Sequence, residues 1–555
     1  MPNDSIEQGG GTLPIPDDFP VTWDSEEEAS SLWRCDDIHS PLPASPMSVS
    51  ISEESMGRGS SKGAQELKRP ERGPRKRING YSYSANAPDT LSAAEREAQR
   101  LTTERAIDNT RRRWDSEFLP ALEQNLRYMR GIDLQDASDE RIRELLDEFM
   151  EINAHHWYIH SMIVFPLTVA VEQTADLYRE IMGRVPDEEP YLLFQGIDNK
   201  TTEVDLAIQT LAKQAMDVPE VLRALRQDGP AEAVTDSLLE SVQGREFVAK
   251  IDHFLAVYGY RPTGFDYVFP SWIEDQSFLM LNLRSYVSTP PRDVKSEMTA
   301  LRKQADQMLG RVLDKAQDVL RFQFLTAYER ARELWPLKED HAFYIDQGTM
   351  ATIRILIAEM GSRLAAKGVL DNPGDVFYIT LTELKTAMEG SAASDLMRRV
   401  EGRRAERERF FKVIPPRFLG TVPLDGAAGT QPEFHRMMGP SQIDGLEADA
   451  SVLRGVAGSK GTATGPAVLV RSPEDFGKVK AGDVLVCTST SPTWTPLFGT
   501  VAALVSDSGG ALSHTAIVAR EYGLPAVVGV RYGTSAISDG QVVTVDGTSG
   551  AVFLR

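Results

Sequence analysis

The sequence predicts a multidomain protein in which a large, mainly α-helical domain is followed by a C-terminal α/β domain. Three observations support this prediction. The chain has 555 residues, more than one ordinary domain holds. Apolar residues recur at helical spacing within 91–443, whereas 454–555 combines short apolar runs with glycine turns. We place a hinge linker between the two domains, at 444–453.

The helical domain is predicted from stretches of periodic apolar residues. One stretch runs from Ile142 to Met150 after a possible N-cap at Ser138. Similar periodicity covers 206–225 and 298–320. Each pattern places apolar side chains on one face of a helix, so these helices are expected to pack around a common core.

The first ninety residues differ from the rest in composition. Residues 1–90 are rich in Ser, Pro, Gly and charge, which predicts a mostly disordered N-terminal arm. The basic run at 68–77 could be a localisation or nucleic-acid patch, but within an acidic chain a solvated linker is favoured. The segment 19–46 holds two tryptophans and spaced prolines, which a purely disordered tail seldom contains. It resembles the leading arm of stand-alone proteins of a known enzyme family, which implies that it docks on the helical body.

Composition argues against several classes of protein. The formal net charge is −21, which disfavours a general nucleic-acid binder. Cys35 and Cys487 are the only cysteines and predict neither a disulfide framework nor a cysteine metal site. The longest apolar run, near 162–171, is short and contains Pro166, and no secretion signal is apparent. We expect a cytoplasmic protein with no nucleic-acid or membrane partner.

The stretch GGALSHTAIVAREYGLPAVVG, from 509 to 529, places His514 between a glycine turn and a short helix predicted over 515–521. The glycines permit a sharp turn, and Ser513 can cap the helix, whose positive end would face an anion on the imidazole. A neutral imidazole nitrogen is a nucleophile at cellular pH. Spacing alone leaves a structural role for His514 open. Asp507 is interpreted either as a turn former or as a partner of the histidine.

The motifs around His514 resemble the phosphohistidine, or swivelling, domain of the phosphoenolpyruvate-utilising enzymes, a family that includes rifampicin phosphotransferase and phenylphosphate synthase. The resemblance runs from GVAGSKGTATGPAVLV at Gly455 through SPTWTPLF at Ser491 to ISDGQVVTVDGTSGAVFL at Ile537. It implies that 454–555 is an α/β phosphohistidine swivelling domain and that His514 is the catalytic, phospho-accepting residue. It also implies that the phosphoryl group is bound by Gly509, Gly510, Ser513 and Thr515.

Two segments of the helical domain resemble the region that lines the acceptor site in rifampicin phosphotransferase. They are YGYRPTGFDYVFPSWIED from Tyr258 and the segment that begins at His341. The family usually has a histidine where this chain has Tyr260, while Arg261 and Glu274 match. We treat these two as candidate substrate-binding residues, which could steer a phosphoryl group or simply pair within the fold.

A histidine cluster, HHWYIH, provides two further candidate substrate-binding residues. His156 and His160 are separated by four positions and share one helical face. Zinc binding is disfavoured because the sequence offers neither the HExxH pattern nor an evident third ligand, so no metal site is expected. A general base for an acceptor hydroxyl and ordinary core histidines both remain open.

No ATP-grasp domain and no phosphoenolpyruvate-binding barrel is recognisable in the sequence. The resemblance therefore implies one subunit of a two-component phosphotransferase, similar to phenylphosphate synthase or cresol-phosphorylating systems. A separate ATP-grasp subunit would use ATP and Mg²⁺, release AMP and phosphate, and phosphorylate His514 within a hetero-oligomer. We expect no tightly bound cofactor on this chain. The expected acceptor is a hydroxyl of a small molecule, favoured as a phenol or alkylphenol.

Two other functions are compatible with the same motifs. One is an ATP-dependent dehydratase or condensing enzyme that acts through a transient alcohol phosphate. The other is a non-catalytic scaffold that retains the swivelling fold, which the intact turn around His514 disfavours.

Overall fold

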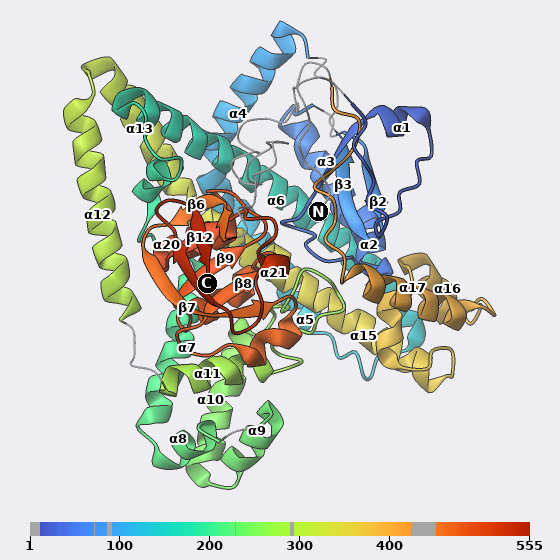
Figure 1. Ribbon diagram of the computed structural model, residues 1–555. Coiled ribbons are helices and arrows are strands. Elements are labelled where there is room, and N and C mark those ends of the chain that lie inside the picture. Colours follow the sequence, from blue (N-terminus) through green and yellow to red (C-terminus); the bar gives the residue numbers. More distant parts are fainter. Residues whose placement is uncertain (1–10, 71–72, 86–90, 228, 289–292, 424–450) are drawn as a thin grey trace.

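The computed structural model describes residues 11–70, 73–85, 91–227, 229–288, 293–423 and 451–555 (Figure 1). Most of the expected hinge at 444–453 lies outside the described residues. The described part is a mainly helical body with an α/β domain at its C-terminal end, as the sequence predicts. None of its helices is both long and apolar enough to cross a membrane.

The helical body is built around α6, which begins at the cap residue Ser138, continues through Pro166 and ends before Gly183. Its first apolar stripe, predicted from Ile142 to Met150, is buried against α15 and its neighbours. The body comprises α4 (Ala93–Arg113), α5 (Leu119–Arg130), α6 (Asp139–Met182), α7 (Lys200–Met216), α8 (Pro219–Leu225), α9 (Ala231–Leu239), α10 (Val242–Tyr258), α11 (Ser277–Ser288), α12 (Val294–Lys315), α13 (Asp318–Leu334), α14 (Leu337–Ala342), α15 (Met350–Ala366), α16 (Leu381–Met388) and α17 (Leu396–Phe410).

Shorter helical elements connect these helices. Two π-helical segments, η2 (Trp114–Phe118) and η4 (Phe343–Thr349), join α4 to α5 and α14 to α15. The predicted helix over 206–225 is divided between α7 and α8, because Pro219 cannot continue the preceding helix and instead starts the next one. The remaining connectors are the 3₁₀ segments η3 (Glu189–Phe194) and η5 (Pro373–Tyr378).

The C-terminal domain is an eight-stranded sheet of order β5-β12-β11-β7-β8-β9-β10-β6. Strands β7, β8, β9 and β10 run parallel in its centre, and the other pairings are antiparallel. Its strands are β5 (Val452–Arg454), β6 (Val456–Ser459), β7 (Thr462–Val470), β8 (Val484–Cys487), β9 (Ala503–Ser506), β10 (Ala526–Val528), β11 (Val542–Asp546) and β12 (Ala551–Leu554). Its helical elements are η6 (Pro473–Lys478), η7 (Pro492–Trp494), α19 (Thr495–Phe498), α20 (His514–Glu521) and α21 (Gly533–Ala536).

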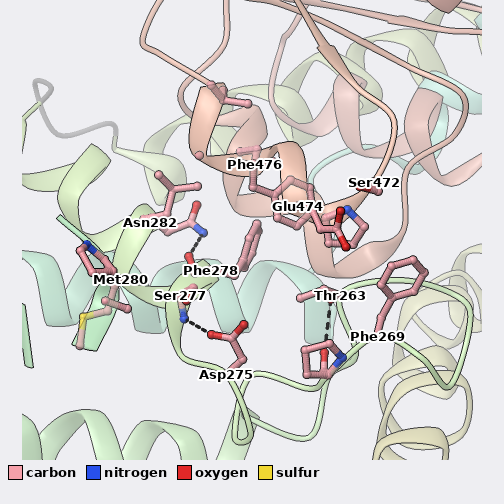
Figure 2. A pocket seen from close by; sticks show the side chains of 18 of the residues that line it. Thr263, Phe269, Asp275, Ser277, Phe278, Met280, Asn282, Ser472, Glu474 and Phe476 are labelled. Atoms are coloured by element: carbon pink, nitrogen blue, oxygen red, sulfur yellow. Dashed lines mark hydrogen bonds between the residues drawn. The ribbon is translucent and has the colours of Figure 1, made fainter. Parts of the chain in front are cut away.

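The two domains pack closely against each other. From α20, Ile517 joins a core shared with α6 and α13, while Val518 joins a second core shared with α7 and α11. A cavity of about 1180 Å³ lies along another part of the boundary, where Phe278 of α11 and Phe476 of η6 approach with ring centroids 4.8 Å apart (Figure 2). The swivelling-type domain is therefore docked on the helical body.

The N-terminal arm differs from the expectation of a mostly disordered segment. Residues 11–70 and 73–85 contain α1 (Glu26–Ser30), β1 (Leu32–Cys35), α2 (Pro46–Ile51), the π-helical η1 (Ser52–Met56), α3 (Gly57–Glu66), β2 (Arg75–Ile78) and β3 (Tyr81–Ala85). With β4 (Phe418–Gly420), the arm forms a sheet of order β2-β3-β1-β4. Long-range pairing to β4 supplies the order that local composition does not indicate.

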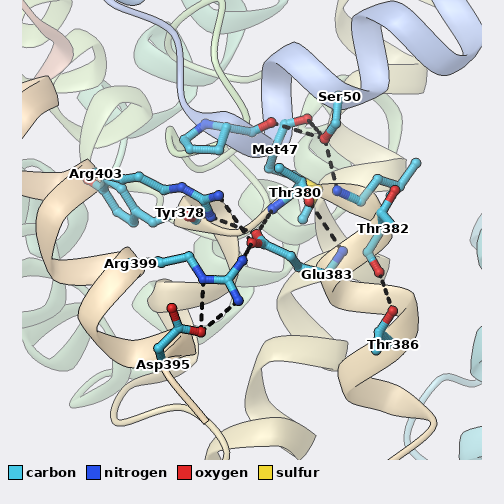
Figure 3. Close-up of polar contacts among 12 residues, drawn as sticks. Met47, Ser50, Tyr378, Thr380, Thr382, Glu383, Thr386, Asp395, Arg399 and Arg403 are labelled. Atoms are coloured by element: carbon cyan, nitrogen blue, oxygen red, sulfur yellow. Dashed lines mark hydrogen bonds and ion pairs between the residues drawn. The ribbon is translucent and has the colours of Figure 1, made fainter. Parts of the chain in front are cut away.

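Buried contacts tie the arm to the body. Phe19 and Trp33 are almost fully buried, and the Ser45 hydroxyl donates to Asp266 at 2.8 Å. Ser50 of α2 accepts from the backbone N–H of Leu381 at 2.9 Å (Figure 3). The same view shows Glu383 of α16 between Arg399 and Arg403. Arg399 donates to the Glu383 carboxylate at 2.7 Å, and Arg403 donates to it at 2.6 Å.

Candidate functional site

His514 is the first residue of α20, and the turn before it has the geometry that its glycines predict. Gly509 has φ +106°, and a Cβ there would lie 2.8 Å from the Ser513 hydroxyl oxygen. The Ser513 side chain caps the helix by accepting from the backbone N–H of Ala516 at 3.3 Å. The backbone N–H groups of His514 and Thr515 lie in the first helical turn, where the helix provides no acceptors. This end of α20 therefore favours an anion.

Two neighbouring residues have structural partners. Thr515 is buried, and its hydroxyl lies 2.8 Å from that of Thr490. Asp507 accepts from the backbone N–H of Thr534 at 3.1 Å and from its hydroxyl. These contacts favour the interpretation of Asp507 as a turn former. The Thr515 side chain secures α20 against the loop before η7, while its backbone remains at the helix end.

The His514 ring faces a carboxylate of the helical domain. Its Nδ1 lies 3.5 Å from Oε2 of Glu339 on α14, and the two side chains are 13% and 7% exposed. Among the described residues, neither ring nitrogen has a hydrogen-bond partner. The Thr201 hydroxyl donates to the same carboxylate oxygen at 2.8 Å. Because Nδ1 faces Glu339, Nε2 is the ring nitrogen that could act as a nucleophile.

The charges around this pair keep Glu339 ionised. Burial opposes ionisation of the carboxyl, but the adjacent His514 ring, Lys338 and the Thr201 hydroxyl together lower its pKa to about 2. A carboxylate beside Nδ1 favours a proton on that nitrogen. Glu339 is thus placed to fix the tautomer of His514 and to stabilise the ring when it carries positive charge.

Arg261 connects the two domains near this pair. It is 2% exposed, donates to the backbone carbonyl of Pro492 at 3.0 Å and lies over the Trp272 ring, 4.9 Å from its centroid. Burial lowers its pKa to about 10, and attraction to Glu339 opposes this shift. Arg261 therefore remains positive at neutral pH beside the His514 site.

The C-terminal part of α20 carries two buried ionisable residues, Arg520 and Glu521, that sequence reasoning missed. Arg520 donates to the backbone carbonyls of Gly458, at 2.8 Å, and of Ala511. Burial raises the pKa of Glu521 to about 8, and repulsion from the Glu339 carboxylate adds to this shift. The missed residues also include Thr201, Lys338 and Glu339. The only available signal was position, since Lys338 and Glu339 lie three and two residues before the quoted segment that begins at His341.

Two of the four predicted substrate-binding residues, His156 and Glu274, are engaged in contacts within the helical body. His156 is fully buried, with Nδ1 2.7 Å from the Thr349 hydroxyl and Nε2 3.1 Å from the Asn125 amide. Burial lowers the pKa of His156 to about 3, so its ring is neutral. Glu274 pairs with Arg354 and not with Arg261. These contacts favour the core-histidine and fold-pairing interpretations.

His160 has different surroundings from His156, although both lie on α6. The centroid of its ring lies 4.5 Å from the ring centroid of Trp157 and 4.9 Å from that of His341. Its Nε2 is 3.7 Å from Asp346. The shared helical face inferred from the sequence therefore does not bring His156 and His160 into one site.

Neither of two large cavities in the described residues is lined by His514. The cavity at the domain boundary has Thr263 and Phe278 in its wall, and a second, of about 850 Å³, lies beside α7 and α12. The docked arrangement thus encloses the His514 ring against Glu339. In this arrangement Nε2 of His514 is buried.

Comparisons with known proteins match both halves of this site. Residues 479–550, which include His514, match the mobile domain of PEP-utilising enzymes, and residues 160–339, which end at Glu339, match the fourth domain of rifampicin phosphotransferase.

Relatives cover these regions and extend beyond them. Chondramide synthase cmdD of Chondromyces crocatus is 33% identical over 98% of this chain and 14% of its own length. The uncharacterised phosphotransferase YvkC of Bacillus subtilis is 29% identical over 77% of this chain and 51% of its own. Rifampicin phosphotransferase of Streptomyces sviceus is 32% identical over 64% of this chain and 40% of its own. The chain thus spans about half or less of these relatives.

Proposed function

We propose that this chain, whose residues 479–550 match the mobile domain of PEP-utilising enzymes, is a phosphotransferase component that carries a phosphoryl group on His514. The group is transferred to a hydroxyl of a small organic acceptor bound by the helical domain. The observation that supports this most strongly is the enclosed contact between His514, at the N-terminal end of α20, and Glu339.

The geometry favours Nε2 as the phosphorylated atom. Nδ1 faces Glu339 at 3.5 Å, so a proton on Nδ1 is stabilised while Nε2 bears phosphorus. An imidazole protonated at Nδ1 is the better leaving group, because departure of phosphorus returns it to the neutral ring. Glu339 therefore acts as a positioning residue that activates the phosphorylated histidine.

Phosphoryl transfer from His514 to the acceptor forms one bond to phosphorus and breaks another. The acceptor oxygen attacks phosphorus, the new O–P bond forms, and the electron pair of the P–Nε2 bond returns to the imidazole. Nε2 is then able to accept the proton that the hydroxyl loses. Phosphoryl transfer depends mainly on positioning and on stabilising charge, which the end of α20 and the cations Arg261 and Lys338 supply.

The phosphoryl donor is ATP, supplied through a separate ATP-grasp subunit that releases AMP and phosphate. The enclosed position of His514 supports a two-position cycle, because a ring that is 13% exposed has to leave Glu339 to meet a donor site. Mg²⁺ acts at that partner site.

The acceptor is a phenol or alkylphenol. Support comes from the aromatic and imidazole rings near α14, where the His160 ring lies tilted against Trp157 and meets His341 edge-on. Flat rings of this kind favour a planar aromatic ligand. His160 is retained as a candidate acceptor-binding residue.

A second candidate is a condensing enzyme or dehydratase that expels the phosphate of a transient alcohol phosphate. The relative named chondramide synthase favours it, because it aligns with 98% of this chain. Both candidates require the same phosphohistidine, so the product distinguishes them.

The test combines the full chain with an ATP-grasp protein, ATP and a panel of phenols and alcohols. We expect an acid-labile phosphoprotein that His514→Ala abolishes and that His253→Ala, at an exposed position on α10, preserves. A stable phosphate ester supports the phosphotransferase, and a dehydrated or condensed product supports the second candidate. Equal labelling of His514→Ala and the parent chain would refute both.

A further inference from the structure

Three metal-ligating side chains meet beside the His514 site. His160 comes from α6, His341 from α14 and Asp346 from η4. One ligand atom of each lies within 4.8 Å of the other two. The Nε2 atoms of His160 and His341 are 3.7 and 3.8 Å from the two carboxylate oxygens of Asp346. From the sequence, zinc was considered at His156 and His160 and no metal site was expected, because His341 and Asp346 come from a distant segment.

The hydrogen bonding of the cluster directs electron pairs inward. His341 is almost fully buried, and its Nδ1 lies 2.6 Å from the backbone carbonyl of Leu337, so Nδ1 carries the proton. Its Nε2 therefore presents a lone pair toward Asp346. Among the described residues, no hydrogen-bond donor reaches Oδ1 of Asp346, although that atom is buried.

A lone pair and a carboxylate that face each other are stabilised by a cation between them.

We propose that His160, His341 and Asp346 bind one divalent transition-metal ion of the Zn²⁺ type. Two imidazoles and one carboxylate form a donor set that suits such ions, and three protein ligands leave a position open, as in catalytic metal sites. Tetrahedral bonds of about 2.1 Å place ligand atoms about 3.4 Å apart. The observed 3.7 and 3.8 Å thus require only a small contraction.

The hydrogen bond that would orient the His341 ring toward a metal is already present. A metal-binding histidine usually donates its other N–H to a carbonyl or carboxylate, which fixes the ring. The bond from His341 to Leu337 has this arrangement, and both residues belong to α14, which also carries Glu339. In the proposed phosphotransferase, an acceptor hydroxyl at the open position would lose its proton more readily. This last role rests on the proposed function, whereas metal binding itself does not.

The experiment titrates the chelator-stripped, tag-free full chain with Co²⁺ alone and records visible absorption, with Zn²⁺ as competitor. We expect one Co²⁺ per chain. Asp346→Asn and His160→Ala should each weaken binding by about 100-fold or more. The matched control is His155→Ala, which removes an exposed imidazole from the same HHWYIH segment and should leave binding unchanged.

Two further measurements separate metal binding from folding and from phosphoryl transfer. His160→Ala alters a partly exposed side chain, and its circular dichroism and melting temperature should match the parent, so lost binding would not reflect unfolding. The chain with His514→Ala should still bind Co²⁺, which separates the metal site from the proposed phosphoryl transfer. The proposal is overturned if the parent chain binds no Co²⁺ or if Asp346→Asn and His160→Ala bind it as the parent does.

Discussion

Replacing Glu339 with glutamine tests how the helical domain activates the phosphorylated histidine. The substitution preserves the shape of the side chain and an oxygen for the Thr201 hydroxyl, but it removes the charge 3.5 Å from Nδ1 of His514. We expect Glu339→Gln to accept the phosphoryl group and to discharge it slowly. The physical reason is that a proton on Nδ1 is no longer stabilised while phosphorus departs from Nε2.

The magnitude follows from the charges at the site. Two unit charges 3.5 Å apart interact by about 5 kcal/mol at an effective dielectric constant of about 20. The pKa of Glu339, about 2 against an ordinary value of 4.5, corresponds to about 3 kcal/mol, shared among His514, Lys338 and Thr201. Assigning about half or more of this to His514 gives a decrease of about 10- to 100-fold in the transfer rate.

The assay isolates the phosphorylated chain and follows loss of phosphohistidine by rapid quench after acceptor is added. Asp340→Asn is the matched control, since Asp340 lies next in sequence and accepts from the backbone N–H of Lys200 at 2.8 Å. Its rate should remain within about twofold of the parent, because the Asp340 carboxylate is bonded to Lys200 and does not contact the His514 ring. Equal discharge rates for Glu339→Gln and Asp340→Asn would refute the role assigned to Glu339.

Three other substitutions test the surrounding structure. Gly509→Ala, at φ +106°, should lower the free energy of unfolding by about 1–3 kcal/mol in urea titrations, whereas Gly477→Ala, with open space around it, should not. His156→Ala should cost about 2 kcal/mol or more through two lost buried hydrogen bonds but leave labelling of His514 intact; loss of labelling in a folded variant would contradict this. From pH 4.5 to about 8 the native Glu521 carboxyl retains a proton that the unfolded chain releases, so stability falls by up to about 1.4 kcal/mol per pH unit. Glu521→Gln should flatten that fall in pH-dependent melting, and an unchanged slope would contradict the raised pKa.

Local patterns were sufficient to predict several elements. The stripe from Ile142 to Met150 is buried in α6, and the cap and glycine turn before His514 form as expected. These features depend on interactions within a few residues, since a helix cap and an apolar stripe are both set by neighbouring positions. The phosphohistidine motif was recognisable for the same reason.

Features that depend on distant partners were not predicted. The N-terminal arm is ordered because β1 pairs with β4, and Glu339 reaches His514 only when the two domains dock. His160, His341 and Asp346 likewise converge from separate segments. Conversely, the four-residue spacing of His156 and His160 suggested one site, but the surrounding helices separate their partners. Tertiary contacts decide such cases, and no local pattern encodes them.

The most direct test of the account is mapping by tandem mass spectrometry of histidine phosphorylation on the full chain, treated with phosphoramidate as a chemical donor that needs no partner protein. We predict phosphate on His514, acquired faster than on the exposed His253. Phosphorylated His253 with a persistently unmodified His514 would contradict it.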